Sequence, residues 1–91
     1  MKDVVQKTLQ AGVETTFDMQ LKRAQFLVKN FTNGFIRVKL GNNDTFTTIG
    51  PSGWERVFNN IDNGRSTIPE VTDIVKVTAD AAGLVEVASI D

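Results

Sequence analysis

The feature that most constrains the fold of this chain is an alternation of apolar and polar residues, interrupted about every ten residues by turn-forming residues. In the clearest segment, FIRVKL at residues 35–40, three aliphatic side chains alternate with Phe35, Arg37 and Lys39. A period of two places these two sets on opposite faces of a β-strand, one of them toward a core. We therefore expect an all-β chain.

The same pattern predicts seven to eight short strands along the chain. The dipeptide Asn33-Gly34 favours a tight hairpin turn, so the runs on either side of it are expected to pair. Residues 80–83, DAAG, predict a second hairpin between the last two strands. Residues 59–70 are polar and rich in turn formers, which indicates a surface loop. The expected strands cover residues 4–9, 13–19, 35–40, 45–49, 54–58, 71–79 and 83–90, with a further β-rich run at 26–34 that ends in the Asn33-Gly34 turn.

The segment before residue 28 supports two interpretations. Phe17, Leu21, Ala24 and Val28 recur at helical spacing. Residues 13–19 alternate instead and are rich in Thr and Val, which favours a strand. We expect strands at 4–9 and 13–19, with QLKR (residues 20–23) as a turn. The prediction for residues 1–91 is a single compact antiparallel β-sandwich or jelly-roll-like domain.

The composition removes most catalytic chemistry. The chain has no His and no Cys, so the usual hydrolytic triads and the commonest metal ligands are not available. Ser52 has no activating base and is better explained as a turn residue. The turns NNDT (residues 42–45) and IDNG (61–64) offer side-chain oxygens without the register of a calcium loop. We expect no enzymatic activity, no cofactor and no metal site.

Charge is divided along the chain, although the net charge is only −1. Residues 1–40 hold seven basic and three acidic residues, and residues 41–91 hold three basic and eight acidic ones. This division is typical of solvated strand faces, or of a head-to-tail contact between neighbouring subunits. The dispersed basic residues and acidic pI disfavour nucleic-acid binding.

No membrane or secretion signal is expected in this chain. No apolar run approaches the ~20 residues that span a bilayer. The first 16 residues lack the hydrophobic stretch of a secretory signal. We therefore expect a protein made in a cytoplasm.

Three aromatic residues, Phe31, Phe35 and Trp54, are candidates for a protein interface. Phe35 belongs to the polar face of its strand, so either flanking loops cover it or a partner does. Trp54, the only Trp, follows a Gly-Pro-Ser-Gly turn, and three roles are open for it: core or rim, subunit contact, or ligand platform. Carbohydrate-binding platforms more often use several Trp and Tyr residues, and this chain has no Tyr.

Three segments together resemble a loose group of small β-sandwich proteins from the structural modules of tailed bacteriophages. They are FLVKNFTNGFIRVKLG, GPSGWERVF and the closing DIVKVTADAAGLVEVASI. The resemblance is one of pattern, with a closing hairpin at Val75–Val87, and the group has no residue motif to carry over.

The resemblance implies a virion component that acts through protein–protein contacts, of the capsid-decoration or head-fibre type. Its partners would be copies of itself, or capsid or tail proteins, with assembly as a homo-oligomer. The alternatives are a tail or baseplate part, or a carbohydrate- or receptor-binding module. Its expected location is the virion, after synthesis in the host cytoplasm.

Overall fold

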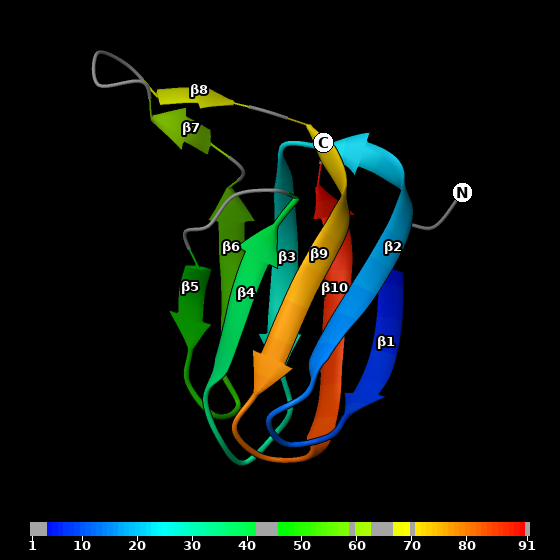
Figure 1. Cartoon of the computed structure of the whole chain (residues 1–91), viewed down its shortest axis with the longest axis vertical. Coiled ribbons are helices and arrows are strands. Elements are labelled where there is room, and N and C mark those ends of the chain that lie inside the picture. The colour runs from blue at the N-terminus through cyan, green and yellow to red at the C-terminus, as the bar shows by residue number, and fades with distance from the viewer. Residues whose placement is uncertain (1–3, 42–45, 59, 63–66, 70, 91) are drawn as a thin grey trace.

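Eight antiparallel strands form the two packed sheets of a small β-sandwich (Figure 1). The computed structural model describes residues 4–41, 46–58, 60–62, 67–69 and 71–90. Within these ranges no helix is long and apolar enough to cross a membrane. The prediction of an all-β sandwich is confirmed.

Each sheet contains four strands, and two further strands form a separate ribbon. The first sheet has the order β1-β10-β3-β6, and the second has the order β2-β9-β4-β5. The ribbon, β7 with β8, projects from one end of the sandwich (Figure 1). The strand bounds are β1 Val4–Leu9, β2 Glu14–Arg23, β3 Gln25–Asn30, β4 Ile36–Leu40, β5 Phe46–Ile49, β6 Trp54–Phe58, β7 Asn60–Asp62, β8 Thr67–Pro69, β9 Thr72–Ala79 and β10 Gly83–Ile90.

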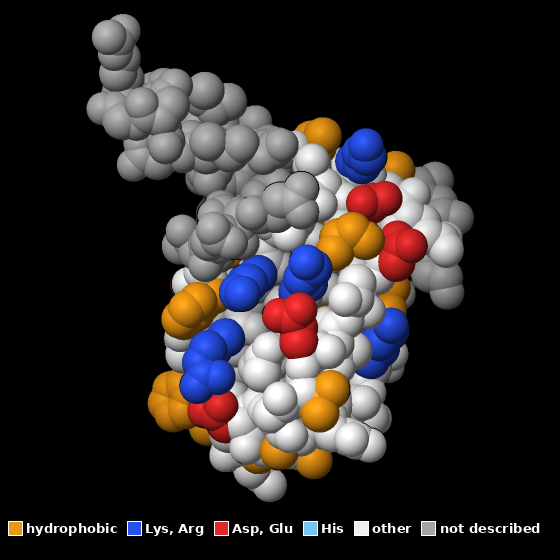
Figure 2. All heavy atoms as spheres, viewed as in Figure 1, with side chains coloured by type: hydrophobic (Ala, Val, Ile, Leu, Met, Phe, Trp, Pro, Cys, Tyr) orange, Lys and Arg blue, Asp and Glu red, His pale blue; other side chains and the backbone are white. Residues whose placement is uncertain are grey.

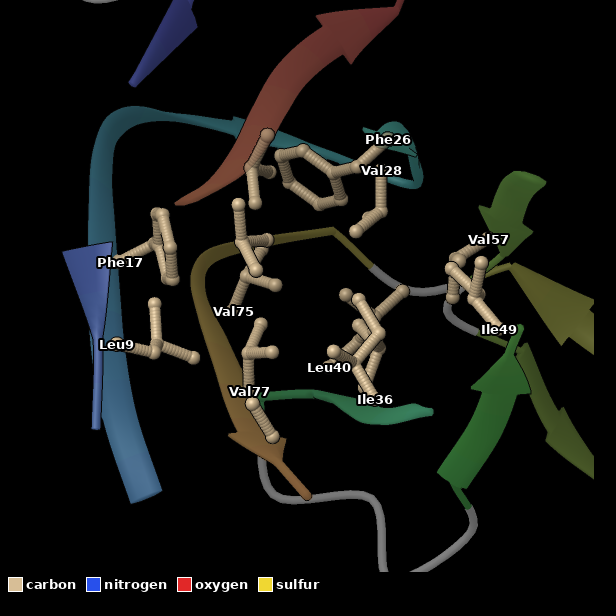
Figure 3. Close-up of a cluster of buried hydrophobic side chains, with 14 of the residues drawn as sticks. Leu9, Phe17, Phe26, Val28, Ile36, Leu40, Ile49, Val57, Val75 and Val77 are labelled. Carbon is tan, nitrogen blue, oxygen red and sulfur yellow. The ribbon is translucent and has the colours of Figure 1, made fainter. Parts of the chain in front are cut away.

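The core lies between the two sheets and is built from the apolar set of each alternating strand. In β4, Ile36, Val38 and Leu40 are buried while Arg37 is exposed, as the alternation predicts. Figure 3 shows aliphatic and aromatic side chains from both sheets meeting between them. Burying each large side chain contributes about 1.5–3 kcal/mol. The core consists of Leu9, Phe17, Met19, Phe26, Val28, Ile36, Val38, Leu40, Ile49, Val57, Val75, Val77, Ala79, Val85 and Val87.

Both predicted hairpins are wrong. The strands on either side of Asn33-Gly34 are β3 and β4, which belong to different sheets, and the same holds for β9 and β10. In each case the connection crosses from one sheet to the other instead of returning along a neighbouring strand. Alternation identifies the inward face of a strand, but both sheets turn their inward faces to the same core. The sequence pattern therefore does not distinguish a hairpin from a crossing.

The N-terminal segment forms strands, and its helical interpretation is wrong. The turn expected at residues 20–23 is also wrong, because β2 continues through it to Arg23. Gln20 has a φ of 60°, and its N–H donates to Asp18 Oδ1 at 3.0 Å. The pairing of β2 with β9 shifts register between Asp18 and Arg23. The turn-like residues thus produce an irregularity within a strand.

The segment expected as a surface loop, residues 59–70, contains the two strands of the ribbon. Asn60–Asp62 pairs antiparallel with Thr67–Pro69. Prediction of a loop for the whole segment was wrong for these six residues.

Among the described residues the fold brings basic residues of the first half of the chain against acidic residues of the second half. Lys29 lies 3.5 Å from Glu86, and Arg37 lies 3.1 Å from Asp80. Each pair joins a base from the first half to an acid from the second. On the face shown in Figure 2, basic and acidic side chains are interspersed.

Replacing a core aromatic tests the assignment of the buried face. We expect Phe26→Ala to lower the free energy of unfolding by about 3–5 kcal/mol, because it removes a fully buried ring and leaves a cavity. Phe35→Ala, which truncates an exposed ring, is the matched control and should cost less than about 1 kcal/mol. Urea unfolding of both variants measures the difference, and equal losses would contradict the assignment.

Candidate protein interface

Four connections meet at one end of the sandwich, called here the loop end. They are residues 10–13, 31–35, 50–53 and 80–82, at the lower end of Figure 1. Each one crosses between the two sheets. Backbone hydrogen bonds join neighbouring segments here, for example from Gly12 N to Ala79 O at 2.8 Å and from Asp80 N to Phe35 O at 2.9 Å.

A buried side-chain amide, that of Asn30, connects two of these loops. Asn30 is only 1% exposed. Its Nδ2 donates to the carbonyl oxygens of Gly34 at 2.8 Å, Ile49 at 3.2 Å and Gly50 at 2.9 Å. Its Oδ1 accepts from the backbone N and the Oγ1 of Thr32, at 2.9 and 2.7 Å. The amide therefore uses both its donor and acceptor groups, as a buried polar group must.

The position of Thr32 is in turn fixed by a close approach of the backbone. Thr32 is 1% exposed, and a Cβ added at Gly83 would lie 2.9 Å from Thr32 Cγ2. Only glycine allows this approach without displacement of Thr32. The glycine at position 83, the first residue of β10, therefore lets this strand approach the loop after β3 closely.

The second loop is a tight turn. Gly53 N donates to Gly50 O at 3.1 Å, and Gly53 O accepts from Asn30 N at 2.8 Å. Pro51 occupies the first central position and Ser52 the second, where φ is 59°. Pro followed by a residue of positive φ is typical of a type II turn. The predicted bend is confirmed, and it is attached directly to Asn30.

Asn30 and Thr32 did not figure among the predicted site residues. A signal for Asn30 was present, because it continues the inward series of Phe26 and Val28 in β3. A polar residue at an inward position requires internal hydrogen-bond partners. The sequence could not show which carbonyls would supply them, since they lie in loops distant along the chain.

Phe31 and Trp54 both lie on the outer face of the first sheet. Phe31 N donates to Leu84 O at 3.0 Å, which extends the pairing of β3 with β10 by one residue. Trp54 lies directly opposite Lys29, two residues before Phe31. Phe31 and Trp54 are thus diagonal cross-strand neighbours, at a separation that aromatic side chains can bridge. Their exposed fractions are 54% and 68%.

The interpretation of Trp54 as a core residue is wrong. Its position in β6 is on the outer face, and Val57 is the residue of that strand which enters the core. The inward position beside it, Glu55, is opposite Val28 and is exposed at the edge of the sheet. The alternation placed Trp54 and Arg56 on one face, but a single sequence could not tell that this face is the outer one.

Phe35 lies apart from the other two aromatic residues. It precedes β4 on the outer face of the second sheet, next to Arg37, and is 52% exposed. One side of the ring lies against the 50–53 turn, where a Cβ added at Gly50 would be 3.6 Å from Phe35 Cε2. Flanking loops therefore cover only part of Phe35, and about half of the side chain stays exposed. The structure places Phe31 and Trp54 on the same face of the first sheet, and Phe35 on the outer face of the second sheet.

We use the name Phe31–Trp54 surface for Phe31, Leu84, Lys29 and Trp54. Its one charged group has a partner within the protein, because Lys29 lies 3.5 Å from Glu86. Glu86 also accepts from Gln6 Nε2 at 2.7 Å. The surface therefore combines two exposed aromatic rings with a cation that already has a counter-charge.

The described residues contain no group of three or more acidic side chains close enough to hold a metal ion. No protein-family model, curated protein or solved structure matches the chain. Its likeness to phage virion proteins therefore remains an interpretation of the sequence pattern. The candidate interface depends on the geometry described above.

Removing the Asn30 amide tests its structural role. We expect Asn30→Ala to lower the free energy of unfolding by about 2–4 kcal/mol, because buried carbonyls and Thr32 lose their hydrogen-bond partner. Asn33→Ala alters an exposed amide in the same loop and should change stability by less than about 0.5 kcal/mol. Urea unfolding compares the two, and similar values would contradict the assigned role.

The positive φ of Ser52 gives a prediction of opposite sign. Ser52→Gly should raise the free energy of unfolding by up to about 1 kcal/mol, since glycine adopts this conformation without a Cβ penalty. Asn33→Gly, at an exposed loop residue whose φ is not positive, serves as the control for the added backbone freedom of glycine. Thermal unfolding would contradict the turn assignment if Ser52→Gly were the less stable of the two variants.

Proposed function

We propose that this chain is a non-enzymatic structural or assembly protein that binds a protein partner through the Phe31–Trp54 surface. The observation that carries the proposal is that two aromatic rings, each more than half exposed, lie beside loops that the buried Asn30 amide holds by hydrogen bonds. Large aromatic side chains supply most of the binding energy at many protein interfaces.

The rigidity of the loop end supports binding. Phe31 directly follows Asn30, and Trp54 directly follows Gly53, whose carbonyl accepts from Asn30 N. Both rings therefore start from backbone positions that are already fixed. A preformed surface loses less conformational entropy when a partner binds, so more of the contact energy appears as affinity.

The nature of the partner is proposed from the sequence resemblance. A capsid-decoration or head-fibre protein binds a repeated site on a particle and needs no catalytic group. A tail or baseplate part would use the same kind of contact. We propose a virion location, with capsid or tail proteins as partners.

A carbohydrate-binding module is the second candidate function. It is favoured by one observation, the exposure of the Trp54 indole, since sugars stack on aromatic faces. The neighbouring side chains favour a protein partner over a sugar. Lys29 and Glu86 already form an ion pair with each other, and the Phe31 ring has no hydrogen-bonding group for a sugar hydroxyl. The test below separates the two candidates.

Truncating the aromatic rings tests the proposal directly. Virion proteins encoded beside the gene of this chain are the binding partners to use. We expect Trp54→Ala and Phe31→Ala each to weaken binding by tenfold or more, equivalent to about 1.4 kcal/mol or above. Phe35→Ala is the matched control, because it removes an equally exposed ring from the opposite face, and it should leave affinity within about twofold.

Two outcomes would contradict the proposal. The first is an affinity that falls as much with Phe35→Ala as with Trp54→Ala. The second is a saturable change in Trp54 fluorescence on titration with oligosaccharides, without binding to any virion protein. Since Trp54 is the only Trp, its fluorescence reports on this surface alone.

A further inference from the structure

The sandwich has four edge strands, and three of them carry features that prevent pairing with another strand. Both edges of the first sheet place a charged residue at an inward position, Lys7 of β1 opposite Val85 and Glu55 of β6 opposite Val28. The edge strand β2 of the second sheet is interrupted after Asp18 by a register shift. Inward-pointing charges and bulges are recognised protections of sheet edges.

Strand β2 has a second protection. Lys7 Nζ donates to the carbonyl oxygen of Thr16 at 2.8 Å. That hydrogen bond occupies a backbone acceptor of the edge strand. The edge formed by β1 and β2 is therefore closed by a side chain that reaches from one sheet to the other.

The fourth edge, β5, lacks these features. Its sequence, Phe46-Thr47-Thr48-Ile49, contains no charge and no proline. Its pairing with β4 is continuous from Phe46 to Ile49, without a bulge. In the described part of the chain it is the last strand of its sheet. Such an uncharged, β-prone edge is a template for a further strand.

The hydrogen-bond pattern shows which backbone groups of β5 have no partner within the described part of the chain. The neighbouring strand β4 sets this pattern. Phe35 O accepts from Asp80 N, so the backbone N–H and C=O groups of odd-numbered residues along β4 point toward β9. Those of the even-numbered Ile36 and Val38 point toward β5. Their partners in β5 are Ile49 and Thr47. The N–H and C=O groups of Phe46 and Thr48 therefore point away from the sheet.

We propose that β5 pairs antiparallel with β5 of a second copy of this chain. In the register that satisfies every free group, Phe46 lies opposite Thr48 of the partner subunit, and Thr48 lies opposite Phe46 of the partner subunit. Each pair exchanges two N–H···O bonds. Thr47 then lies opposite Thr47 of the partner subunit, on the two-fold axis. The result is one continuous eight-stranded sheet across two copies.

A second copy fits this edge because the register is self-complementary. In a two-fold symmetric dimer a residue near the axis lies close to its own counterpart, so a charged residue there would meet a like charge. Pairing through β6 in the corresponding register would bring the two Arg56 side chains together on the axis, whereas β5 brings only Thr and Phe together. An aromatic ring opposite a β-branched residue is also a favourable cross-strand pair.

Single-cysteine variants test both the dimer and its register, because the chain contains no cysteine of its own. We expect Thr47→Cys to form a disulfide-linked dimer of twice the 10.0 kDa chain mass under mild oxidation. Residues facing each other in a non-hydrogen-bonded pair have Cα atoms about 4.5 Å apart, which suits a disulfide. The matched control is Thr48→Cys, which is more exposed but is displaced from its counterpart by two residues along the strand.

A second variant pair measures association without cross-linking. Phe46→Lys should raise the dimer dissociation constant tenfold or more in sedimentation equilibrium, because it adds charge to the edge. Val4→Lys places the same charge on an exposed position of β1 and should leave the constant within about twofold. Circular dichroism checks that each variant retains its sheet structure.

Three results would overturn the inference. They are a Thr47→Cys chain that stays monomeric under oxidation, equal cross-linking by Thr48→Cys, and equal effects of Phe46→Lys and Val4→Lys. The Phe31–Trp54 surface lies on the other sheet, so Trp54→Ala should leave cross-linking of Thr47→Cys unchanged. Failure of this inference and failure of the proposed function are therefore separately visible.

Discussion

The side-chain amide of Asn30 joins the segments on which the loop end depends. It lies at the end of β3, and its hydrogen bonds reach the loop after β3 and the turn between β5 and β6. Because these loops cross between the sheets, the amide also connects the two layers of the sandwich at this end. A domain of this size has a small core, so a buried and fully satisfied polar group adds specificity that apolar packing alone does not supply.

The exposed aromatic rings follow from this arrangement. Phe31 directly follows Asn30, and Trp54 directly follows Gly53, whose carbonyl oxygen accepts from Asn30 N. The outer face of the first sheet thus carries two exposed rings, while backbone groups at the β5 edge of the second sheet have no partner among the described residues. The interactions proposed for the two surfaces differ: burial of aromatic rings against a protein partner, and backbone strand pairing with a second copy. Together they suit a part that repeats within a larger assembly.

The sequence predicted the inward and outward residues better than the topology. Alternation identified Ile36, Val38 and Leu40 as core residues, because a period of two is a local property of each strand. It could not separate hairpins from crossings, since β3 and β4 present apolar faces to the same core from different sheets. It could not decide whether Trp54 points to the core or to solvent, because the same alternating set in WERVF contains both a charged residue, Arg56, and an apolar one, Phe58. The partners of Asn30 are carbonyls of distant loops, which no local pattern encodes.

The central claim is that Asn30 is a fully satisfied buried amide that fixes the loop end. Hydrogen exchange of its side-chain NH₂ group, followed by NMR with Asn33 as the exposed internal reference, tests this claim most directly. We expect the Asn30 Nδ2 protons to exchange as slowly as backbone amides in the core strands, because both are held by carbonyls inside the sandwich. Exchange of Asn30 at the rate of Asn33 would contradict the account.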